Sequence, residues 1–209
     1  MNSKLFLFVF SALVSYLVAG INPAILLSKM IYHQDIRTLG SKNPGFTNFK
    51  RVFGNRYAWY VFALDILKNL VLCLIFCPLF QNIMQDGALG AAYVGVCAML
   101  GHAFPVWYHF QGGKGFLVGA TVIWFIDWRV GLIAFAIWGI LLFVTKYMSL
   151  SVIAAAVSCP VSLLLLGTAH TATWFLCLGA SLLMIIRHRE NIKRLLAGKE
   201  SRFHLKGER

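Results

Sequence analysis

Three stretches of this 209-residue sequence combine small residues, hydroxyls, amides and cations, the groups from which phosphate-binding sites are built. The first covers residues 35–51 and interleaves glycines with four polar side chains: Ser41, Asn43, Thr47 and Asn48. Small residues let the backbone approach a ligand closely, and hydroxyls, amides and cations donate to phosphate oxygens. A solvated basic loop has the same composition, so both interpretations stay open.

The second stretch covers residues 101–115 and ends in Gly112-Gly113-Lys114-Gly115, just before an apolar run. Free backbone N–H groups and the positive end of a following helix attract an anion, and Lys114 adds a charge. The Gly-x4-Gly-Lys-Ser/Thr spacing of a Walker loop is absent. The four residues therefore fit either a phosphate cradle or a plain turn.

The third stretch covers residues 187–203 and directly follows a long apolar run. On a helix, His188, Asn191 and Leu195 share one face, and Glu190 lies one turn before Arg194, which predicts an ion pair between them. A basic helix beside a membrane that contacts anionic lipid headgroups is the alternative.

The amino-acid composition indicates the class of protein in which these stretches are held. The chain is 59% hydrophobic and 12% charged, with a net charge of +12, whereas soluble domains are nearer 45–50% apolar and about 25% charged. This excludes a cytosolic globule, a disordered chain and a disulfide scaffold. The five cysteines lie inside apolar runs without partners at zinc-ligand spacing, so we interpret them as buried small side chains.

A membrane span needs about 20 mostly apolar residues. Candidate spans cover residues 4–29, 57–80, 88–105, 114–127, 130–146, 150–168 and 171–187. The first is read as a retained span rather than a signal peptide, and Pro23 and Pro160 are expected to bend their spans. The fourth and fifth separate only at Asp127-Trp128-Arg129, so a re-entrant hairpin is the alternative there. The sequence thus predicts an all-α integral membrane protein with about seven transmembrane helices, in a single domain over residues 1–209.

The distribution of Lys and Arg sets the expected orientation. With the N-terminus outside and the C-terminus cytoplasmic, sixteen of the 19 cations fall in inner segments, including Lys206 and Arg209 near the end of the chain. Only Lys4 and Arg129 fall outside. The remaining cation, Lys68, lies within the second span three residues after Asp65, and we interpret the two as a structural ion pair.

In this order and on one side of the membrane, the three stretches resemble the acyl-phosphate:glycerol-3-phosphate acyltransferases, the PlsY family. The matching strings are Asp35-Ile-Arg37, Gly40-Ser41, Asn43-Pro-Gly45, Thr47-Asn48 and Arg51, then Gly101-His102, Phe104-Pro-Val106 and Gly112-Gly-Lys-Gly115, then His188, Glu190-Asn-Ile, Arg194-Leu, Gly198 and Glu200. Leu64-Asp65, Leu67-Lys68 and Ser149-Leu-Ser151 also fit. The resemblance covers nearly the whole chain.

The resemblance implies a bacterial inner-membrane enzyme whose site opens to the cytoplasm. Such an enzyme transfers an acyl group from acyl phosphate to the 1-hydroxyl of sn-glycerol 3-phosphate, giving lysophosphatidic acid and phosphate for phospholipid synthesis. The implied partners are these two substrates and membrane lipid, with no cofactor, metal or nucleic acid.

Carried over to matching positions, the resemblance implies catalytic roles for Ser41, Arg51, Lys114, His188 and Asn191. It implies substrate binding by Gly40, Asn43, Gly45, Thr47, Asn48, His102, Gly112, Gly113, Gly115 and Ser149, with Ser149 near the donor phosphate. Glu190, Asp65 and Lys68 are expected to be structural.

The chain departs from the family pattern at four places. Lys42 stands where the family usually has Gly, Phe46 where it has Ala, and Gln111 where it has Lys, and Phe116-Leu-Val-Gly119 replaces a Val-Ala-Thr run. These changes bear on acceptor affinity and loop shape more than on the reaction class.

Two other functions remain open from the sequence alone. A small-solute or phosphate-ester transporter would place polar residues near the midplane in broken helices or inverted repeats. Here polar residues concentrate at the inner boundary, which favours an interfacial enzyme. A degenerate relative that binds lipid phosphate without turnover is the third reading.

Overall fold

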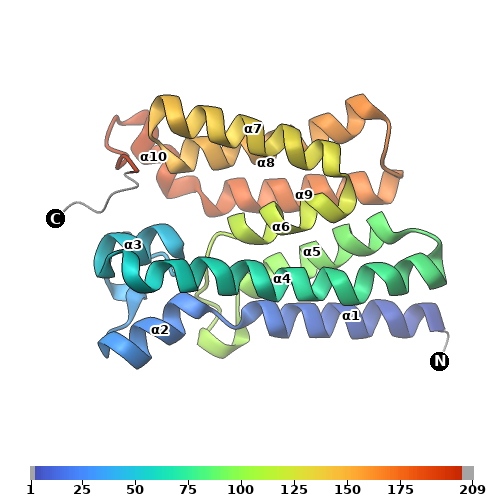
Figure 1. The fold of residues 1–209 in the computed structure, drawn as a ribbon, viewed down its shortest axis with the longest axis horizontal. Coiled ribbons are helices and arrows are strands. Elements are labelled where there is room, and N and C mark those ends of the chain that lie inside the picture. The colour runs from blue at the N-terminus through green and yellow to red at the C-terminus, as the bar shows by residue number, and fades with distance from the viewer. Residues whose placement is uncertain (1–2, 204–209) are drawn as a thin grey trace.

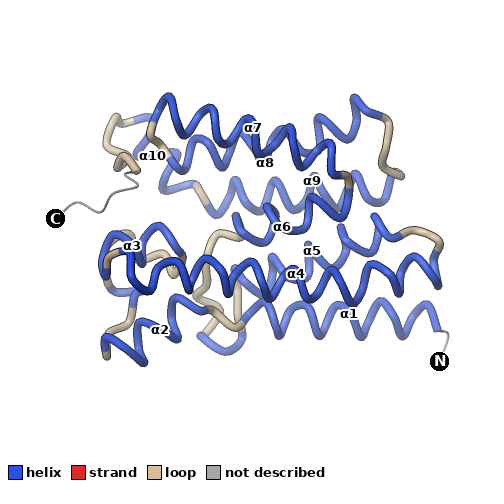
Figure 2. The backbone as a smooth tube through the Cα atoms, viewed as in Figure 1, coloured by secondary structure: helices blue, strands red, loops and turns tan. Residues whose placement is uncertain are grey.

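The computed structural model describes residues 3–203, and Lys206 and Arg209, counted among the inner cations, lie outside this range. The described residues form helices joined by short loops, with no strand among them (Figure 2). The helices are α1 (Ser3–Gly20), α2 (Pro23–Tyr32), η1 (Ile36–Thr38), α3 (Phe46–Phe53), α4 (Asn55–Met84), α5 (Gly87–Ala103), η2 (Val106–Tyr108), α6 (Phe116–Ile126), α7 (Trp128–Thr145), α8 (Met148–Leu166), α9 (Thr171–Arg187) and α10 (Arg189–Leu196).

The prediction of an all-α integral membrane protein is confirmed in its coarse form. Five helical segments in the described range are long and apolar enough to cross a membrane, and a sixth qualifies if α9 and α10 are taken together. α6 is apolar but has only 11 residues. The count of seven spans therefore stays a prediction.

The long helices lie nearly parallel, in two groups (Figure 1). α1, α4 and α5 pack against one another, α8 packs against both α7 and α9, and α6 contacts α4, α5 and α7. The start of α1 lies at one end of the bundle, and α3 and α10 lie at the other (Figure 1). The short helices and loops that follow α2 and α9 thus gather at one end.

The first predicted span is interrupted before Pro23 rather than bent at it. Asn22 caps α2 by accepting a hydrogen bond from Ile25 N, and proline is favourable in the first turn because its missing N–H has no helical partner there. The ammonium of Lys68 donates to the carbonyls of Ala19 and Ile21 at 2.8 Å each, which satisfies backbone acceptors left open by the break. Pro160, the other predicted bend, lies within α8 without interrupting it.

The predicted Asp65–Lys68 pair is confirmed. Lys68 Nζ lies 2.8 Å from Asp65 Oδ1, and the two side chains are 10% and 2% exposed. Because an isolated charge inside a membrane is costly, this pairing and the carbonyl contacts explain how Lys68 is tolerated.

The helices separate at Asp127 as predicted, whereas the choice between a full span and a re-entrant hairpin for α6 stays a prediction. The Asp127 carboxylate accepts from Arg129 N at 2.9 Å and from the Arg129 guanidinium, so it both caps α7 and ends α6. α6 is consequently short, and its first residues lie beside the loop that carries Lys114.

Candidate active site

The three polar stretches meet around one cavity of about 650 Å³ at the α3 and α10 end of the bundle. All five predicted catalytic residues line it: Ser41, Arg51, Lys114, His188 and Asn191. Of the predicted binding residues, it is also lined by Gly40, Asn43, Gly45, Thr47, Asn48, His102, Gly115 and Ser149, whereas Gly112 and Gly113 are not among its lining residues. We call this space the active-site cavity.

Asn48 shapes the loop that presents Ser41. Its side-chain oxygen accepts from Ser41 N at 2.8 Å, and its amide donates to Leu39 O at 3.0 Å. Gly40 must be glycine, because its φ is +55° and an added Cβ would lie 2.4 Å from Asn48 Oδ1. The Asn48 side chain, predicted to bind substrate, is therefore occupied in holding this loop.

Lys42 takes a left-handed conformation with φ of +60°. Glycine adopts this region freely, whereas a lysine is strained there. A glycine at this position would adopt the same conformation without this cost in conformational energy. Phe46, the other departure in this stretch, packs its ring against Trp59 and Phe62 of α4, with centroids 5.1 and 5.3 Å apart.

The expectation that Gly112 and Gly113 offer free amides to a phosphate is wrong. Gly113 N donates to His102 O at 3.0 Å and Gly112 N to Ala103 O at 3.2 Å. A Cβ at either glycine would lie 2.1 Å from an atom of His102, so both are glycine because α5 packs against them. Their carbonyls accept from the Arg187 guanidinium at 2.9 and 3.1 Å, which fixes the loop before Lys114. No pattern in the sequence indicates this role of Arg187.

Lys114 and the start of α6 supply the anion-binding groups that remain. Gly115, with φ of +84°, turns the chain into α6 without a side-chain cap, and Phe116 and Leu117 line the active-site cavity. The first N–H groups of a helix lack helical partners, so this end carries partial positive charge. Burial lowers the pKa of Lys114 to about 8, and the nearby Arg194 contributes. The ammonium donates to the side-chain oxygen of Asn191.

His188 stands at the 58° bend between α9 and α10 and is 5% exposed. Its Nδ1 lies 2.8 Å from Met184 O, so Nδ1 carries the hydrogen and Nε2 is left as an acceptor. Burial lowers the pKa of His188 to about 4. The imidazole is therefore neutral near pH 7.

Glu200 holds three side chains of this part of the site, a role that was not predicted from the sequence. One carboxylate oxygen accepts from Asn191 Nδ2 at 2.6 Å and from Ser149 Oγ at 2.7 Å, and the other from Arg194 Nε at 2.7 Å. Burial raises the pKa of this carboxyl, but these three hydrogen bonds together outweigh burial, so the pKa is lowered. Ser149 lines the active-site cavity and donates to Glu200, and its expected contact with a donor phosphate stays a prediction.

The predicted ion pair between Glu190 and Arg194 is wrong. Glu190 lies 3.2 Å from Lys193 Nζ and 3.7 Å from Arg189 Nε, and its side chain is 59% exposed. Arg194 pairs with Glu200 because the chain turns back after Gly198, whose φ is +65°. Glu200 therefore forms the ion pair that was expected of Glu190.

The segment that carries Glu200 lies against the active-site cavity. Ser201 Oγ accepts from Arg51 Nη2 at 2.8 Å, and Phe203 N donates to Lys146 O at 2.7 Å. The segment thereby links α3, the start of α8 and α10 around the cavity.

The other side of the active-site cavity is apolar. It is lined by Phe46, Trp59, Phe62, Phe116, Leu117, Trp138, Leu142, Met148 and Val152. The cavity thus combines cationic and hydrogen-bonding groups with a wall suited to a hydrocarbon chain. Within residues 3–203 no group of three or more His, Cys, Asp or Glu residues could hold a metal ion.

Comparison with known proteins gives a consistent result. The sequence pattern of the family described as glycerol-3-phosphate acyltransferase matches residues 9–198. A glycerol-3-phosphate acyltransferase of Thermoanaerobacter pseudethanolicus is 40% identical over 200 residues, covering 96% of this chain and 98% of the relative. One from Coxiella burnetii is 34% identical over 198 residues, covering 95% and 99%.

Solved structures agree in fold. The crystal structure of PlsY (YgiH), an integral membrane glycerol 3-phosphate acyltransferase, in its glycerol 3-phosphate form superposes with a TM-score of 0.82 at 33% identity, covering 97% of this chain and 96% of that one. Its lysophosphatidic acid form gives a TM-score of 0.78 at 32% identity, with 94% and 95% covered.

Proposed function

The chain belongs to the glycerol-3-phosphate acyltransferase family, and from this premise we propose that it transfers an acyl group from acyl phosphate to the 1-hydroxyl of sn-glycerol 3-phosphate. The products are lysophosphatidic acid and inorganic phosphate. The single observation that carries the proposal is the active-site cavity, in which cationic groups for two phosphates face an apolar wall for one acyl chain. One membrane-embedded domain, residues 1–209, performs the reaction without a cofactor.

The acceptor and donor phosphates take different parts of the cavity in this proposal. Lys114 and the first N–H groups of α6 bind the phosphate of glycerol 3-phosphate, because they form the buried cationic end of the cavity. Ser41 and Arg51 hold the donor phosphate and the oxygen of the reacting carbonyl, since both project from the loop and helix that Asn48 fixes.

The hydroxyl proton needs an acceptor as the alcohol attacks the carbonyl carbon. Neutral His188 can accept a hydrogen bond at Nε2 and so orient the hydroxyl, but a pKa of about 4 makes it a weak base. The new carbon–oxygen bond forms, the bond from carbon to the phosphate oxygen breaks, and the departing phosphate takes the proton. His188→Ala should therefore be impaired but active.

We place the active-site cavity on the cytoplasmic side of a bacterial inner membrane. Sixteen of the 19 Lys and Arg residues lie in the segments assigned to that side. Seven crossings, counting α1–α2 as one span and α6 and α9 as one each, put the two termini on opposite sides. In Figure 1, α1 starts at one end of the bundle and α10 lies at the other, which supports an odd number of membrane crossings.

This orientation predicts a labelling pattern. Cysteine at Lys42 or Arg202 should react with a membrane-impermeant maleimide only from the cytoplasmic side, and cysteine at Thr168 only from outside. All three positions are exposed, whereas the five native cysteines are buried or half-buried, so unsubstituted protein is the control. Labelling of position 42 from outside would overturn both the orientation and the placement of the site.

The lowered pKa of Lys114 predicts the alkaline limb of the pH profile. The amine binds phosphate electrostatically only while protonated, so its contribution is nearly complete well below pH 8 and is lost as pH rises through about 8. Because kcat/KM reports ionisations of the free enzyme, kcat/KM for glycerol 3-phosphate should fall up to about tenfold per pH unit above that value.

Lys114→Arg is the matched control for this limb, because guanidinium stays protonated throughout the range. The variant should have a lower but flat kcat/KM from pH 7 to 10. An alkaline limb that persists unchanged in Lys114→Arg would show that another group produces it.

The proposed function is tested with purified protein in detergent or nanodiscs. Palmitoyl phosphate should release inorganic phosphate only when sn-glycerol 3-phosphate is present, and mass spectrometry should detect an equal amount of lysophosphatidic acid. Palmitoyl-CoA in place of the acyl phosphate should give no product. Absence of acceptor-dependent release, or equal turnover of palmitoyl-CoA, would contradict the proposal.

A further inference from the structure

Ser201, Arg202 and Phe203 bridge the two groups of helices at the end of the bundle where α3 and α10 lie (Figure 1). Ser201 Oγ accepts from Arg51 Nη2 at 2.8 Å, on α3, which packs against α4. Phe203 N donates at 2.7 Å to the carbonyl of Lys146, which lies between α7 and α8. We call these three residues the C-terminal strap. Ser201 and Phe203 both line the active-site cavity, so the strap forms part of its wall.

The strap lies at an edge where the active-site cavity meets solvent. Ser201 and Arg51 are exposed although both line the cavity, whereas His188 and Asn191 are buried in it. This edge is at the end of the bundle that we place on the cytoplasmic side. Glycerol 3-phosphate is charged and water-soluble, so it must enter the cavity from the aqueous side.

The strap is held less firmly than the residue before it. The Glu200 side chain is 7% exposed and accepts three hydrogen bonds, so the chain is anchored up to this residue. Beyond it, the strap is held by one backbone hydrogen bond, by the exposed contact of Ser201 with Arg51, and by Lys50 Nζ, 4.7 Å from the centroid of the Phe203 ring. Polar contacts at an exposed edge gain little, because water offers the same hydrogen bonds. The strap can therefore open while Glu200 stays in place.

An acyl phosphate reacts with water as well as with an alcohol. In hydrolysis the water oxygen bonds to the carbonyl carbon, the bond from this carbon to the phosphate oxygen breaks, and the departing phosphate takes a proton from the water. The products are a carboxylic acid and inorganic phosphate. Arg51 is proposed to contact the donor phosphate and the carbonyl oxygen, so the strap residue bonded to Arg51 lies beside the reacting carbon. Closure over such a group excludes water and prevents the side reaction.

We propose that the C-terminal strap opens to admit glycerol 3-phosphate and closes over both substrates, and that Phe203 makes the enzyme specific for the alcohol over water. The inference rests on the proposed function, because it takes acyl phosphate as the donor. Phe203 carries this role because it makes two of the strap's contacts, with Lys146 through its backbone and with Lys50 through its ring. The strap lies beyond residue 198, where the match to the family pattern ends, so the inference comes from contacts of this chain.

The experiment measures lysophosphatidic acid and inorganic phosphate in the same reaction of purified protein with palmitoyl phosphate and sn-glycerol 3-phosphate, after subtraction of the phosphate released without protein. Wild type should form about one lysophosphatidic acid per phosphate. Phe203→Ala should lower this ratio below about one half and raise acceptor-independent phosphate release at least about tenfold, because water then reaches the carbonyl. Phe203→Tyr keeps an aromatic ring over Lys50 and should restore the ratio.

The ratio does not depend on the amount of folded protein, since unfolded chains form neither product. If Phe203→Ala gives no folded protein at all, Phe203→Leu decides the matter. Leucine keeps most of the apolar surface but loses the aromatic contact with Lys50, so it should lower the ratio to a value between those of alanine and wild type.

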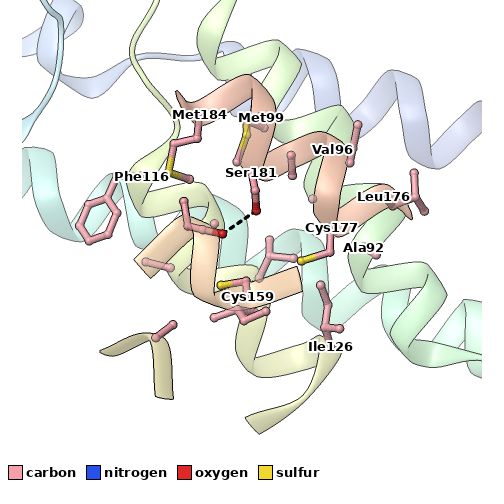
Figure 3. Close-up of a pocket in the computed structure, with 18 of the residues that line it drawn as sticks. Ala92, Val96, Met99, Phe116, Ile126, Cys159, Leu176, Cys177, Ser181 and Met184 are labelled. Atoms are coloured by element: carbon pink, nitrogen blue, oxygen red, sulfur yellow. Dashed lines mark hydrogen bonds between the residues drawn. The ribbon is translucent and has the colours of Figure 1, made fainter. Parts of the chain in front are cut away.

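Two variants are matched controls. Arg202 is exposed and does not line the active-site cavity, so Arg202→Ala should leave the ratio unchanged. Ser181→Ala tests general loosening of the bundle: it removes the hydrogen bond from Ser181 Oγ to Ala156 O, 2.8 Å, in a smaller cavity that no strap residue lines (Figure 3). It should lower stability without changing the ratio.

An unchanged ratio in Phe203→Ala, or an equal fall in Ser181→Ala, would overturn the inference while leaving the proposed function intact. Absence of lysophosphatidic acid from the wild-type reaction would instead contradict the proposed function.

Discussion

Arg51→Ala should lower kcat by about 100- to 1000-fold with little change in KM for glycerol 3-phosphate, because Arg51 is proposed to stabilise charge that develops as the carbonyl is attacked. Arg51 lines the active-site cavity from α3, and its guanidinium donates to the neutral Ser201 hydroxyl at 2.8 Å. No carboxylate within residues 3–203 forms an ion pair with it. Its charge is therefore available to an anionic ligand.

Lys114→Ala provides the comparison needed to interpret the kinetics of Arg51→Ala. Lys114→Ala should raise KM for glycerol 3-phosphate and change kcat less, since its proposed contact is with the phosphate of the acceptor throughout the reaction. Arg51→Lys should restore activity only partly, because an ammonium cannot donate two parallel hydrogen bonds. Ser201→Ala controls for loss of the contact with the segment that carries Glu200. If both alanine variants alter only KM, the role assigned to Arg51 is wrong.

Many residues that line the active-site cavity can be identified from the sequence, because polar residues stand out beside the apolar membrane spans. Ser41, Lys114 and His188 lie far apart along the chain, yet each follows or precedes an apolar run on the same side of the membrane. Helices that cross a membrane nearly in parallel bring such positions together. Polar composition and topology thus place these residues on one side of the membrane, and the resemblance to the PlsY family adds the expectation that they share one site.

The predictions that were wrong concern residues whose contacts depend on how a loop folds back on the helices. The expected pairing of Glu190 with Arg194 follows the helical i,i+4 rule, but Arg194 meets Glu200 through a turn at Gly198. In the same way, Gly112 and Gly113 before Lys114 have the composition of a phosphate-binding loop, but the sequence does not show how they pack against α5. Gly112 and Gly113 pack against His102 and Ala103, and only coordinates reveal that their amides are already used.

The last span is predicted at residues 171–187, and α9 covers Thr171–Arg187. The bend that follows it was not predicted from the sequence. The 58° bend at His188 directs α10 away from α9. The bend buries both His188 and Asn191 beside Lys114, although no proline or glycine marks it in the sequence.

Substitution of Glu200 is expected to have the second large effect, on both stability and activity. Glu200→Ala should lower stability by on the order of 3 kcal/mol, because Asn191, Ser149 and Arg194 each lose an acceptor in a place where the Glu200 side chain is 7% exposed. Loss of these hydrogen bonds frees Asn191 and, through it, Lys114, so the folded fraction should lose at least about 100-fold in kcat/KM. Purified yield, thermal unfolding and single-turnover rate measure the two losses separately.

Glu190→Ala is the matched control, since that side chain is 59% exposed and pairs only with exposed cations. It should stay within about 0.5 kcal/mol of wild type and remain active. A stable but inactive Glu190→Ala would show that Glu190 itself is needed for activity.

Glu200→Gln then separates positioning from base catalysis. The pKa of Glu200 is lowered, so its carboxylate is fully ionised at neutral pH and its stabilising effect is lost only as pH falls through the lowered value. Glutamine keeps one acceptor oxygen and should retain part of the stability and rate. Between pH 6 and 9 its profile should have the same shape as the wild type, because the group that takes the proton is the departing phosphate. A well-folded Glu200→Gln with no activity, or with residual activity whose pH profile lacks one ionisation, would instead make Glu200 the general base.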